Sequence, residues 1–250
     1  MAISRRGATT LDGVLLVDKP VGMTSHDVVD YLRKLTGEGR IGHAGTLDPA
    51  ATGLLIVCIG PATRLSDHLM AYDKEYLARI AFGQSTTTDD TEGTITRTLV
   101  PPEIIADPEY AMSVLSGLVG SIMQIPPQYS AIKQAGKTAY KQARQGHQVN
   151  LEPRQVSIYK LDLLNCSANS WDIIAIVSKG TYIRALARDI GELVGCPAHL
   201  AGLRRLAIGP WHVSQAYTLE MLKQASDNDA ISSCFIKVDD KPRGIIRKRG

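Results

Sequence analysis

A stretch rich in glycine and proline, Arg40 to Gly53, carries the side chains best suited to chemistry, His43 and Asp48. Its three glycines and Pro49 disfavour both helix and strand. It leads directly into an apolar run, Leu54 to Ile59, that is typical of a buried strand. Loops anchored on core strands often hold catalytic side chains. Because Asp-Pro is also a common turn pair, the alternative is a surface connection in which Asp48 only caps a turn.

A single carboxylate such as Asp48 can act as a nucleophile where it stays ionised in a pocket with little water. Burial favours the neutral carboxyl, whereas a neighbouring guanidinium favours the charged form. Arg184 stands at the start of a predicted helix, where its charge opposes the helix dipole, so a carboxylate partner elsewhere would explain it. Tyr76 and Tyr182 fall near predicted strand ends, and aromatic faces beside such a pair favour a planar, stacked substrate.

Other chemistries find little support in the sequence. It contains no phosphate-binding Gly-x-x-x-x-Gly-Lys-Ser/Thr run and no Gly-x-Gly-x-x-Gly after a strand, so we expect no nucleotide cofactor. His26, His43, His68 and Asp48 lack the spacing of metal ligands, so we expect no metal. A hydrolase triad of Ser25, His43 and Asp48 is conceivable, but no nucleophile elbow accompanies it. The four cysteines are scattered, which favours reduced thiols.

Composition indicates an ordinary globular protein outside the membrane. The 250 residues are 44% hydrophobic and 21% charged, and no apolar run approaches the roughly 20 residues of a membrane helix. The N-terminus lacks the apolar core of a secretory signal, so we expect a cytoplasmic protein. The formal net charge of +3 does not by itself indicate a nucleic-acid partner.

The charge distribution is more informative than the total. Between Ile125 and Arg154 the chain combines cations with aromatic rings and has Glu152 as its single acid. These cations and rings are Lys133, Lys137, Lys141, Arg144, Arg154, Tyr129, Tyr140 and His147. Such a surface suits contacts to phosphates and bases, although a solvated helix and loop would have the same composition.

Hydrophobic periodicity predicts an alternation of strands and helices. The expected strands are Gly13 to Val17, Leu54 to Ile59, Glu75 to Phe82, Val156 to Leu164 and Trp171 to Val177. The first expected helix starts after Thr24 or Ser25 and reaches Leu35. The others run from Arg64 to Met70, Pro101 to Leu118, Ile183 to Val194 and Leu219 to Gln224. A hairpin is expected within Gln84 to Thr98, and the segment from Leu203 to Trp211 should end in a short strand.

Five blocks of this sequence, in order, resemble the TruB family of pseudouridine synthases. The central one is Gly42-His43-x-Gly-Thr-Leu-Asp-Pro-x-Ala-Thr-Gly around Asp48. The others are Asp18 to Ser25, Lys74 to Tyr76, Pro126 to Lys133, and Ser178 to Gly191. The resemblance covers about Gly13 to Trp211, and the joint occurrence of the blocks is highly specific.

The resemblance implies isomerisation of uridine 55 in the T-loop of tRNA to pseudouridine, without a cofactor or metal. Asp48 would be the nucleophile, Arg184 would pair with it, and Tyr76 would stack on the base and take part in proton transfer. His43, Tyr182 and Leu203 would line the substrate pocket. Extruding the target base costs a few kcal/mol before a side chain can reach it.

The resemblance also implies an α+β fold with a mixed, largely antiparallel central sheet, flanking helices and an RNA-gripping thumb. We expect a catalytic domain at residues 1–225, a thumb insertion at about 124–154, and a C-terminal tail at 226–250 without a complete PUA domain. The expected partner is the T-arm stem-loop of tRNA, bound by a monomer. The alternative from another functional class is a non-catalytic RNA-binding or tRNA-folding protein that uses the same cleft.

Overall fold

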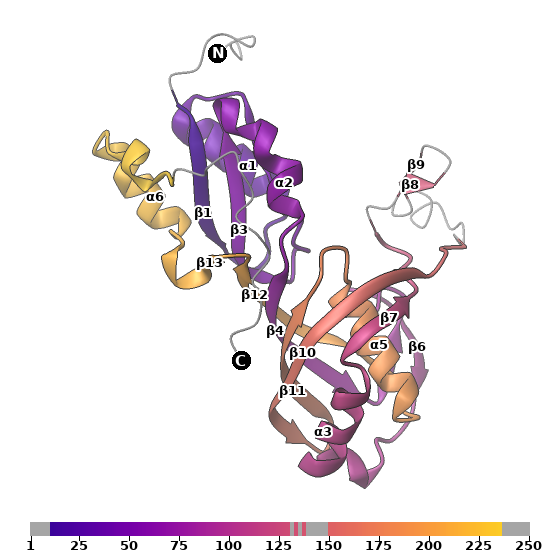
Figure 1. Ribbon diagram of the computed structural model, residues 1–250. Coiled ribbons are helices and arrows are strands. Elements are labelled where there is room, and N and C mark those ends of the chain that lie inside the picture. The colour runs from indigo at the N-terminus through magenta and orange to yellow at the C-terminus, as the bar shows by residue number, and fades with distance from the viewer. Residues whose placement is uncertain (1–10, 131–132, 135–136, 139–149, 237–250) are drawn as a thin grey trace. The chain divides into compact units, whose positions relative to one another are not determined.

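The computed structural model describes residues 11–130, 133–134, 137–138 and 150–236 (Figure 1). The chain forms two compact units, which are described separately. The first comprises Met1–Glu75 with Arg204–Gly250, and the second comprises Tyr76–Leu203. The chain therefore crosses between the units within two strands, β4 (Lys74–Phe82) and β12 (Ala198–Ile208).

The first unit is built on strands β1 (Gly13–Lys19) and β3 (Thr52–Ile59), which pair antiparallel over their full length. Strand β3 also pairs antiparallel with β2 (Ile41–His43) and parallel with the C-terminal part of β12. Side chains alternate between two buried clusters, one on each face of β1 and β3. The continuous apolar runs that predicted these two strands arise because both of their faces are covered.

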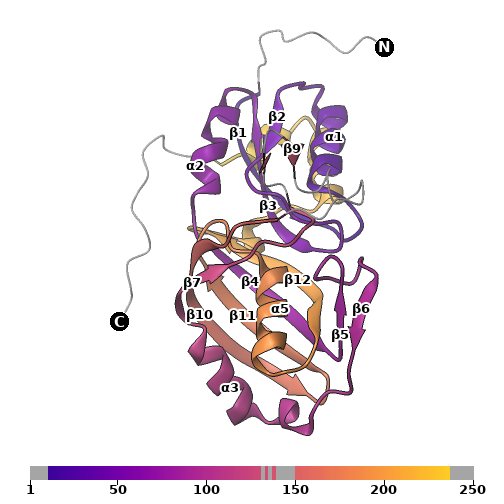
Figure 2. The same ribbon diagram turned by 90° about the vertical axis from the view of Figure 1, so that its right-hand side faces the viewer.

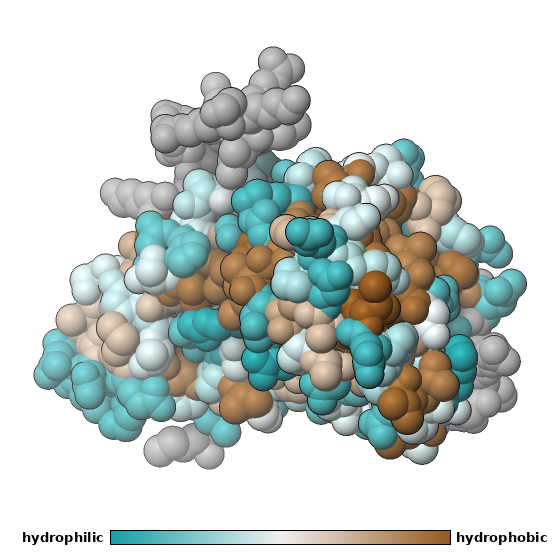
Figure 3. All heavy atoms as spheres, turned by 90° about the horizontal axis from the view of Figure 1, so that it is seen from below, coloured by the Kyte–Doolittle hydropathy of each residue, from teal (hydrophilic) through white to brown (hydrophobic). Residues whose placement is uncertain are grey.

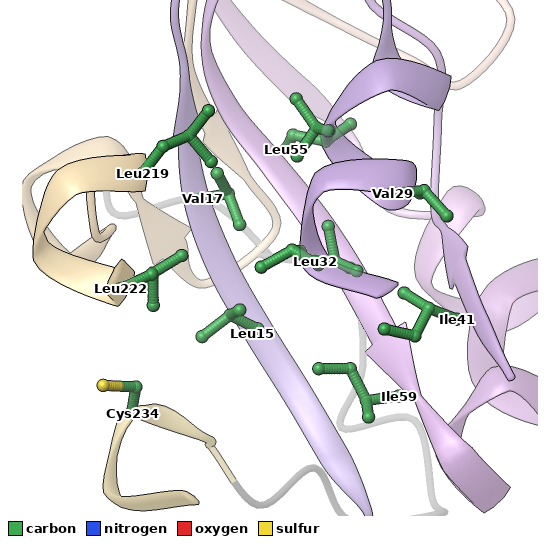
Figure 4. Close-up of a cluster of buried hydrophobic side chains, with 12 residues drawn as sticks. Leu15, Val17, Val29, Leu32, Ile41, Leu55, Ile59, Leu219, Leu222 and Cys234 are labelled. Atoms are coloured by element: carbon green, nitrogen blue, oxygen red, sulfur yellow. The ribbon is translucent and has the colours of Figure 1, made fainter. Parts of the chain in front are cut away.

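Helices cover the faces of this sheet. Helix α1 (Ser25–Thr36) begins after Thr24, whose hydroxyl accepts from the Asp27 amide at 3.0 Å while the Asp27 carboxylate accepts from the Thr24 amide at 2.8 Å. It ends at Gly37, a left-handed cap. Leu32 of α1 and Leu222 of α6 (Leu219–Asp227) lie in the same buried cluster as Leu15 of β1 (Figure 4).

The remaining elements of the first unit are short. They are the 3-10 helices η1 (Gly60–Leu65), η3 (Val213–Gln215) and η4 (Ile231–Cys234), the helix α2 (Ser66–Met70) and the strand β13 (Trp211–His212).

The second unit contains a sheet in the order β12, β4, β11 (Ser170–Val177), β10 (Arg154–Ser167) and β7 (Gly120–Gln124). Figure 2 shows α5 (Ile183–Leu193) in front of this sheet and α3 (Pro108–Gly117) beside its lower end. In β4 the residues Tyr76, Ala78, Ile80 and Phe82 are buried and Arg79 is exposed, as the alternation predicted. The mixed, largely antiparallel α+β architecture is confirmed.

One prediction about an element needs correction, and another is incomplete. The expected helix from Pro101 to Leu118 is a 3-10 helix, η2 (Glu103–Ala106), followed by α3, because Asp107 caps a new helix by accepting from the Glu109 amide at 2.8 Å. The segment from Leu203 to Trp211 does end in a short strand, β13, as predicted, and its first part belongs to the long strand β12, whose partners are remote in sequence.

The expected hairpin is present as β5 (Gln84–Thr86) and β6 (Ile95–Thr98). Within the segment expected to form a thumb, the backbone forms a hairpin of β8 (Lys133–Gln134) and β9 (Lys137–Thr138). The predictions for Tyr140, Lys141, Arg144 and His147 lie outside the described residues.

The surface mixes polar and apolar side chains. In Figure 3, brown apolar patches are interrupted by teal hydrophilic ones, so this face presents no single continuous apolar area. Among the helices that the structure describes, none is long and apolar enough to cross a membrane.

Candidate active site

The loop between β2 and β3, residues 44–51, carries Asp48, and buried side chains of the first unit hold its backbone. The Ser25 hydroxyl, from the first turn of α1, accepts from the Leu47 amide at 2.8 Å and donates to the Leu47 carbonyl at 3.1 Å. Ser25 is 2% exposed. Its hydroxyl therefore anchors the residue directly before Asp48, which is a structural task and not that of a hydrolase nucleophile.

Lys19 holds the other side of the same loop. Its side chain is fully buried, and Nζ donates to the carbonyls of Pro20, Met23 and Pro49 at 2.9, 2.6 and 3.4 Å. The Gly22 amide also donates to the Pro49 carbonyl, at 2.9 Å. The residue directly after Asp48 is thus tied to the turn that connects β1 to α1.

A second buried cation, Arg205 of β12, contacts the loop at Gly45 and Thr46. Sequence reasoning missed it. It lies beside Arg204, a partly exposed residue that forms a bidentate pair with Asp18 at 2.7 and 3.0 Å. Nothing in the Leu-Arg-Arg-Leu run shows which arginine is buried, because that depends on the pairing of β12 with β3.

Asp48 itself is partly buried, between the buried Leu47 and the partly buried Pro49. Its carbonyl accepts from the Ala51 amide at 3.1 Å, which closes the turn. The structure therefore presents this carboxylate on a loop whose backbone is fixed on both sides, so the position of its Cα is set before any substrate arrives.

His43 ends β2, opposite Val57 of β3. Its Nδ1 atom is buried and has no hydrogen-bond partner in the described structure. Burial lowers the pKa of His43, and the positive charges of Arg205 and His26 lower it further. The imidazole is therefore neutral near pH 7 and retains a ring nitrogen available for hydrogen bonding.

In the second unit, Arg184 lies in the first turn of α5 and is 8% exposed. Nη1 is 3.3 Å from the Asp90 carboxylate and donates to the Thr88 carbonyl at 3.2 Å, and Nη2 donates to the Tyr129 carbonyl at 2.9 Å. The sequence predicted a carboxylate partner for this arginine, and Asp90 is one. The pairing of Arg184 with Asp48 stays a prediction.

Asp90 was not identified from the sequence. Its Oδ1 accepts from the Thr88 hydroxyl and, at 3.0 Å, from the Glu92 amide, while Oδ2 faces Arg184. A Thr-x-Asp turn of this kind is common in loops, so its pairing with an arginine 94 residues away carries no local sequence signal.

One turn further along α5, Arg188 joins two more carboxylates. It contacts Asp89 and Asp189, each at 2.9 Å, and donates to the Ile125 carbonyl at 2.7 Å. Burial raises the pKa of Asp89 and of Asp189, and in both cases the charge of Arg188 opposes that rise.

The other predicted site residues also belong to the second unit. Tyr76 is buried in β4, and Leu203 is partly buried in β12. Tyr182 precedes α5, and the Gln124 side-chain amide bonds both its backbone amide, at 2.9 Å, and its carbonyl, at 3.2 Å. Asp48 and His43 therefore belong to one unit, and Tyr76, Tyr182, Arg184 and Leu203 belong to the other.

A metal site was another reading of the histidines. Within residues 11–130 and 150–236, no group of three or more His, Cys, Asp or Glu side chains is arranged to hold a metal ion.

Two family models match the chain. The N-terminal domain of the TruB family of pseudouridylate synthases matches residues 33–183, and the C-terminal domain of tRNA pseudouridylate synthase B matches residues 184–237. Among similar proteins, the tRNA pseudouridine synthase B of Bordetella parapertussis is 42% identical over 98% of this chain and 99% of its own length. That of Syntrophotalea carbinolica is 45% identical over 88% of this chain and 71% of its own.

Solved structures share the fold. A chain in the crystal structure of a Cbf5-Nop10-Gar1 complex superposes with a TM-score of 0.70 at 27% identity. The match covers 90% of this chain but 60% of that one, so this chain spans less than two thirds of that neighbour. The expected pseudouridine synthase fold is confirmed, and the chain belongs to the TruB family of pseudouridylate synthases, which makes it an isomerase.

Proposed function

We propose that this chain isomerises uridine 55 in the T-loop of tRNA to pseudouridine, with Asp48 as the nucleophile. The observation that supports this assignment most directly is the fixed backbone on both sides of Asp48. Buried Lys19, Ser25 and Arg205 bond the residues before and after it. A carboxylate held in this way loses little orientational freedom in reaching the transition state, which is where an enzyme gains most of its rate.

The reaction needs no change in composition or redox state, because a base–sugar bond is broken and remade within one nucleotide. In the proposal, Asp48 attacks the extruded nucleotide, Tyr76 stacks on its base and Arg184 pairs with Asp48. His43, Tyr182 and Leu203 contact the nucleotide. The buried, unpartnered Nδ1 of His43 supports this part, because a polar atom in that state is expected to gain a partner when substrate binds.

The proposed partner is the T-arm stem-loop of tRNA, and relatives at 42 and 45% identity are tRNA pseudouridine synthases by name. The proposal includes the domain division expected from the sequence, a catalytic domain of residues 1–225 with a thumb insertion at 124–154. It also includes a monomeric enzyme in the cytoplasm.

The decisive experiment compares Asp48→Asn with wild type on a T-arm RNA that carries tritium at C5 of the target uridine. Isomerisation releases this tritium, whereas binding or refolding of RNA does not. We expect Asp48→Asn to bind the RNA with an unchanged Kd and to release no tritium. The matched control is Asp67→Asn, which alters an exposed aspartate in the first turn of α2.

Normal turnover by Asp48→Asn would reject Asp48 as the nucleophile. If wild type releases tritium but the pseudouridine formed does not map to position 55, the proposed target is rejected and the isomerase activity stands. A wild-type protein that binds the RNA without releasing tritium would favour the RNA-folding alternative.

A further inference from the structure

Arg205 is among the largest fully buried side chains of the protein, at 1% exposure. It lies on β12 in the first unit, and none of the chemistry proposed above uses it. A buried guanidinium loses the hydration of its charge, which costs several kcal/mol unless the surroundings replace it. Its environment therefore shows what the residue does.

Every hydrogen bond of Arg205 in the described structure goes to a backbone carbonyl. Nε donates to Leu54 at 2.7 Å, Nη1 to Thr46 at 3.4 Å and Nη2 to Gly45 at 3.1 Å. Leu54 belongs to β3, whereas Gly45 and Thr46 lie two and three residues before Asp48. The planar guanidinium therefore connects strand β3 to the part of the loop that precedes Asp48. Its donors are held in a fixed geometry by the planar group.

The backbone of Arg205 is itself paired with the start of β3, directly after the Asp48 loop. Arg205 pairs with Gly53 in the parallel register of β12 and β3. Gly53 has φ of +100°, and a Cβ there would lie 2.3 Å from the Arg205 carbonyl oxygen. Arg205 thus contacts the start of β3, directly after the loop, through its backbone at Gly53, and the first part of the loop through its side chain at Gly45 and Thr46.

We propose that Arg205 is a positioning residue for pseudouridine formation, whose guanidinium holds the Gly45 and Thr46 carbonyls so that Asp48 is presented in its reactive orientation. This inference rests on the proposed role of Asp48. Arg205 acts through the loop and does not contact the substrate.

Carbonyl partners also preserve the charge of Arg205. Oriented dipoles stabilise a cation without cancelling it, whereas a carboxylate would neutralise it. Burial is the main cause of the lowered pKa of His43, and the positive charge of Arg205 lowers it further. The side chain that holds the loop therefore also favours the neutral form of His43.

The test uses Arg205→Gln and Arg205→Lys in the full chain, assayed by single-turnover tritium release from the T-arm RNA. A displacement of about 1 Å at a catalytic group lowers rates on the order of 100-fold, and this is the loss expected in kcat for Arg205→Gln. Because Arg205 does not touch the RNA, Kd should stay within about twofold of wild type. Arg205→Lys should recover about tenfold of the loss, because an ammonium can still donate to these carbonyls.

The control is Arg79→Gln, another strand arginine, which makes two hydrogen bonds to Asp172 on the exposed surface. It removes one positive charge without touching the loop, and its kcat should equal that of wild type. A thermal unfolding midpoint is measured for each variant. If Arg205→Gln fails to fold, Arg205→Lys carries the test, with an expected fall in kcat at unchanged Kd.

Folded variants with wild-type kcat would overturn the inference, as would a loss that appears in Kd alone. Asp48→Asn run in parallel separates the two proposals. If Asp48→Asn is inactive and the Arg205 variants are fully active, only the positioning role fails. If Asp48→Asn keeps normal turnover, the nucleophile assignment fails first.

Discussion

The two units hold their buried cations with different acceptors. In the first unit, Lys19 and Arg205 donate to backbone carbonyls around the Asp48 loop. In the second, Arg184 and Arg188 also donate to backbone carbonyls, but each is paired with a carboxylate as well, that of Asp90 and of Asp89 respectively. All four cations are at least partly buried, so the difference lies in what surrounds them.

A cation that donates to backbone carbonyls fixes the backbone conformation, since each of its hydrogen bonds depends on the path of the main chain. Carboxylate acceptors make it one member of a charge cluster, which responds to pH and to the removal of a single acid. The first arrangement suits a loop that must stay in place, and the second suits a side chain whose charge and direction must be fixed. The following substitutions test this contrast.

The largest effect is expected from Arg184→Lys. A lysine keeps the charge but cannot direct separate donors to Asp90, Thr88 and Tyr129 as the guanidinium fork does. We expect pseudouridine formation to fall about 1,000-fold, equivalent to about 4 kcal/mol of barrier, as measured by tritium release. A rate within a few-fold of wild type would show that a point charge suffices here.

In the first unit, Gly53→Ala should be strongly destabilising. The residue has φ of +100°, and its new methyl group would meet the Arg205 backbone oxygen at 2.3 Å. We expect the free energy of unfolding in urea to fall by about 3 kcal/mol or more. Gly37→Ala is the matched control, because Gly37 has φ of +70° with nothing within 4 Å of the added carbon. Equal losses in the two variants would assign the effect to backbone strain alone.

Local sequence patterns predicted much of the fold. The runs in β1 and β3, the alternation in β4 and the Thr24 cap of α1 are each specified by neighbours in the chain. Strand β12 was not predicted, because Gly202, Arg204 and Arg205 interrupt any simple period. Its burial depends on β3, about 150 residues earlier, and no local pattern records that pairing.

The same limit applies to the candidate site. Asp48 was identified because glycine and proline fix the loop that carries it, and Arg184 because its charge opposes a helix dipole. Arg205 and Asp90 escaped notice because their partners are distant in sequence. The residues proposed to do chemistry, Asp48 and Arg184, have a signal in their local sequence. The residues Arg205 and Asp90, which contact the Asp48 loop and Arg184 respectively, are revealed only by tertiary contacts.

A further test of the carbonyl-bound cations is Lys19→Met. Methionine matches the length of the buried stem but leaves the carbonyls of Pro20 and Met23 without the Lys19 donor, whereas the Pro49 carbonyl keeps the Gly22 amide. Unsatisfied buried acceptors cost about 1–3 kcal/mol each, partly relieved by relaxation, so we expect a loss of about 2–3 kcal/mol in urea unfolding. Lys160→Met, at an exposed lysine paired with Asp162, should unfold like wild type. A stable Lys19→Met protein would show that these bonds add little.

The smallest expected effect is a difference in pH dependence between the units. The pKa of His43 is lowered from 6.5, so the unfolded chain binds its proton more readily than the folded one. Its contribution to stability is therefore complete above about pH 6.5 and is lost as the pH falls toward the lower, folded value. For Asp89 and Asp189 the change of stability with pH has the opposite sign. Their pKa values are raised from 3.8, so the folded state keeps the proton to higher pH than the unfolded chain does. Their contribution is lost as the pH rises from about 3.8 through the folded value.

Urea unfolding of wild type and His43→Gln between about pH 5 and pH 7.5 isolates the contribution of His43, since the two proteins differ only in that side chain. Wild type should lose up to about 1 kcal/mol more than the variant over this range, within the limit of 1.36 kcal/mol per pH unit for one proton. Parallel curves would mean that His43 titrates alike in both states. In that case Arg205 would affect only the geometry of the Asp48 loop. The two units would then differ in the hydrogen bonds of their buried cations and not in how those cations shift the pKa values of neighbouring groups.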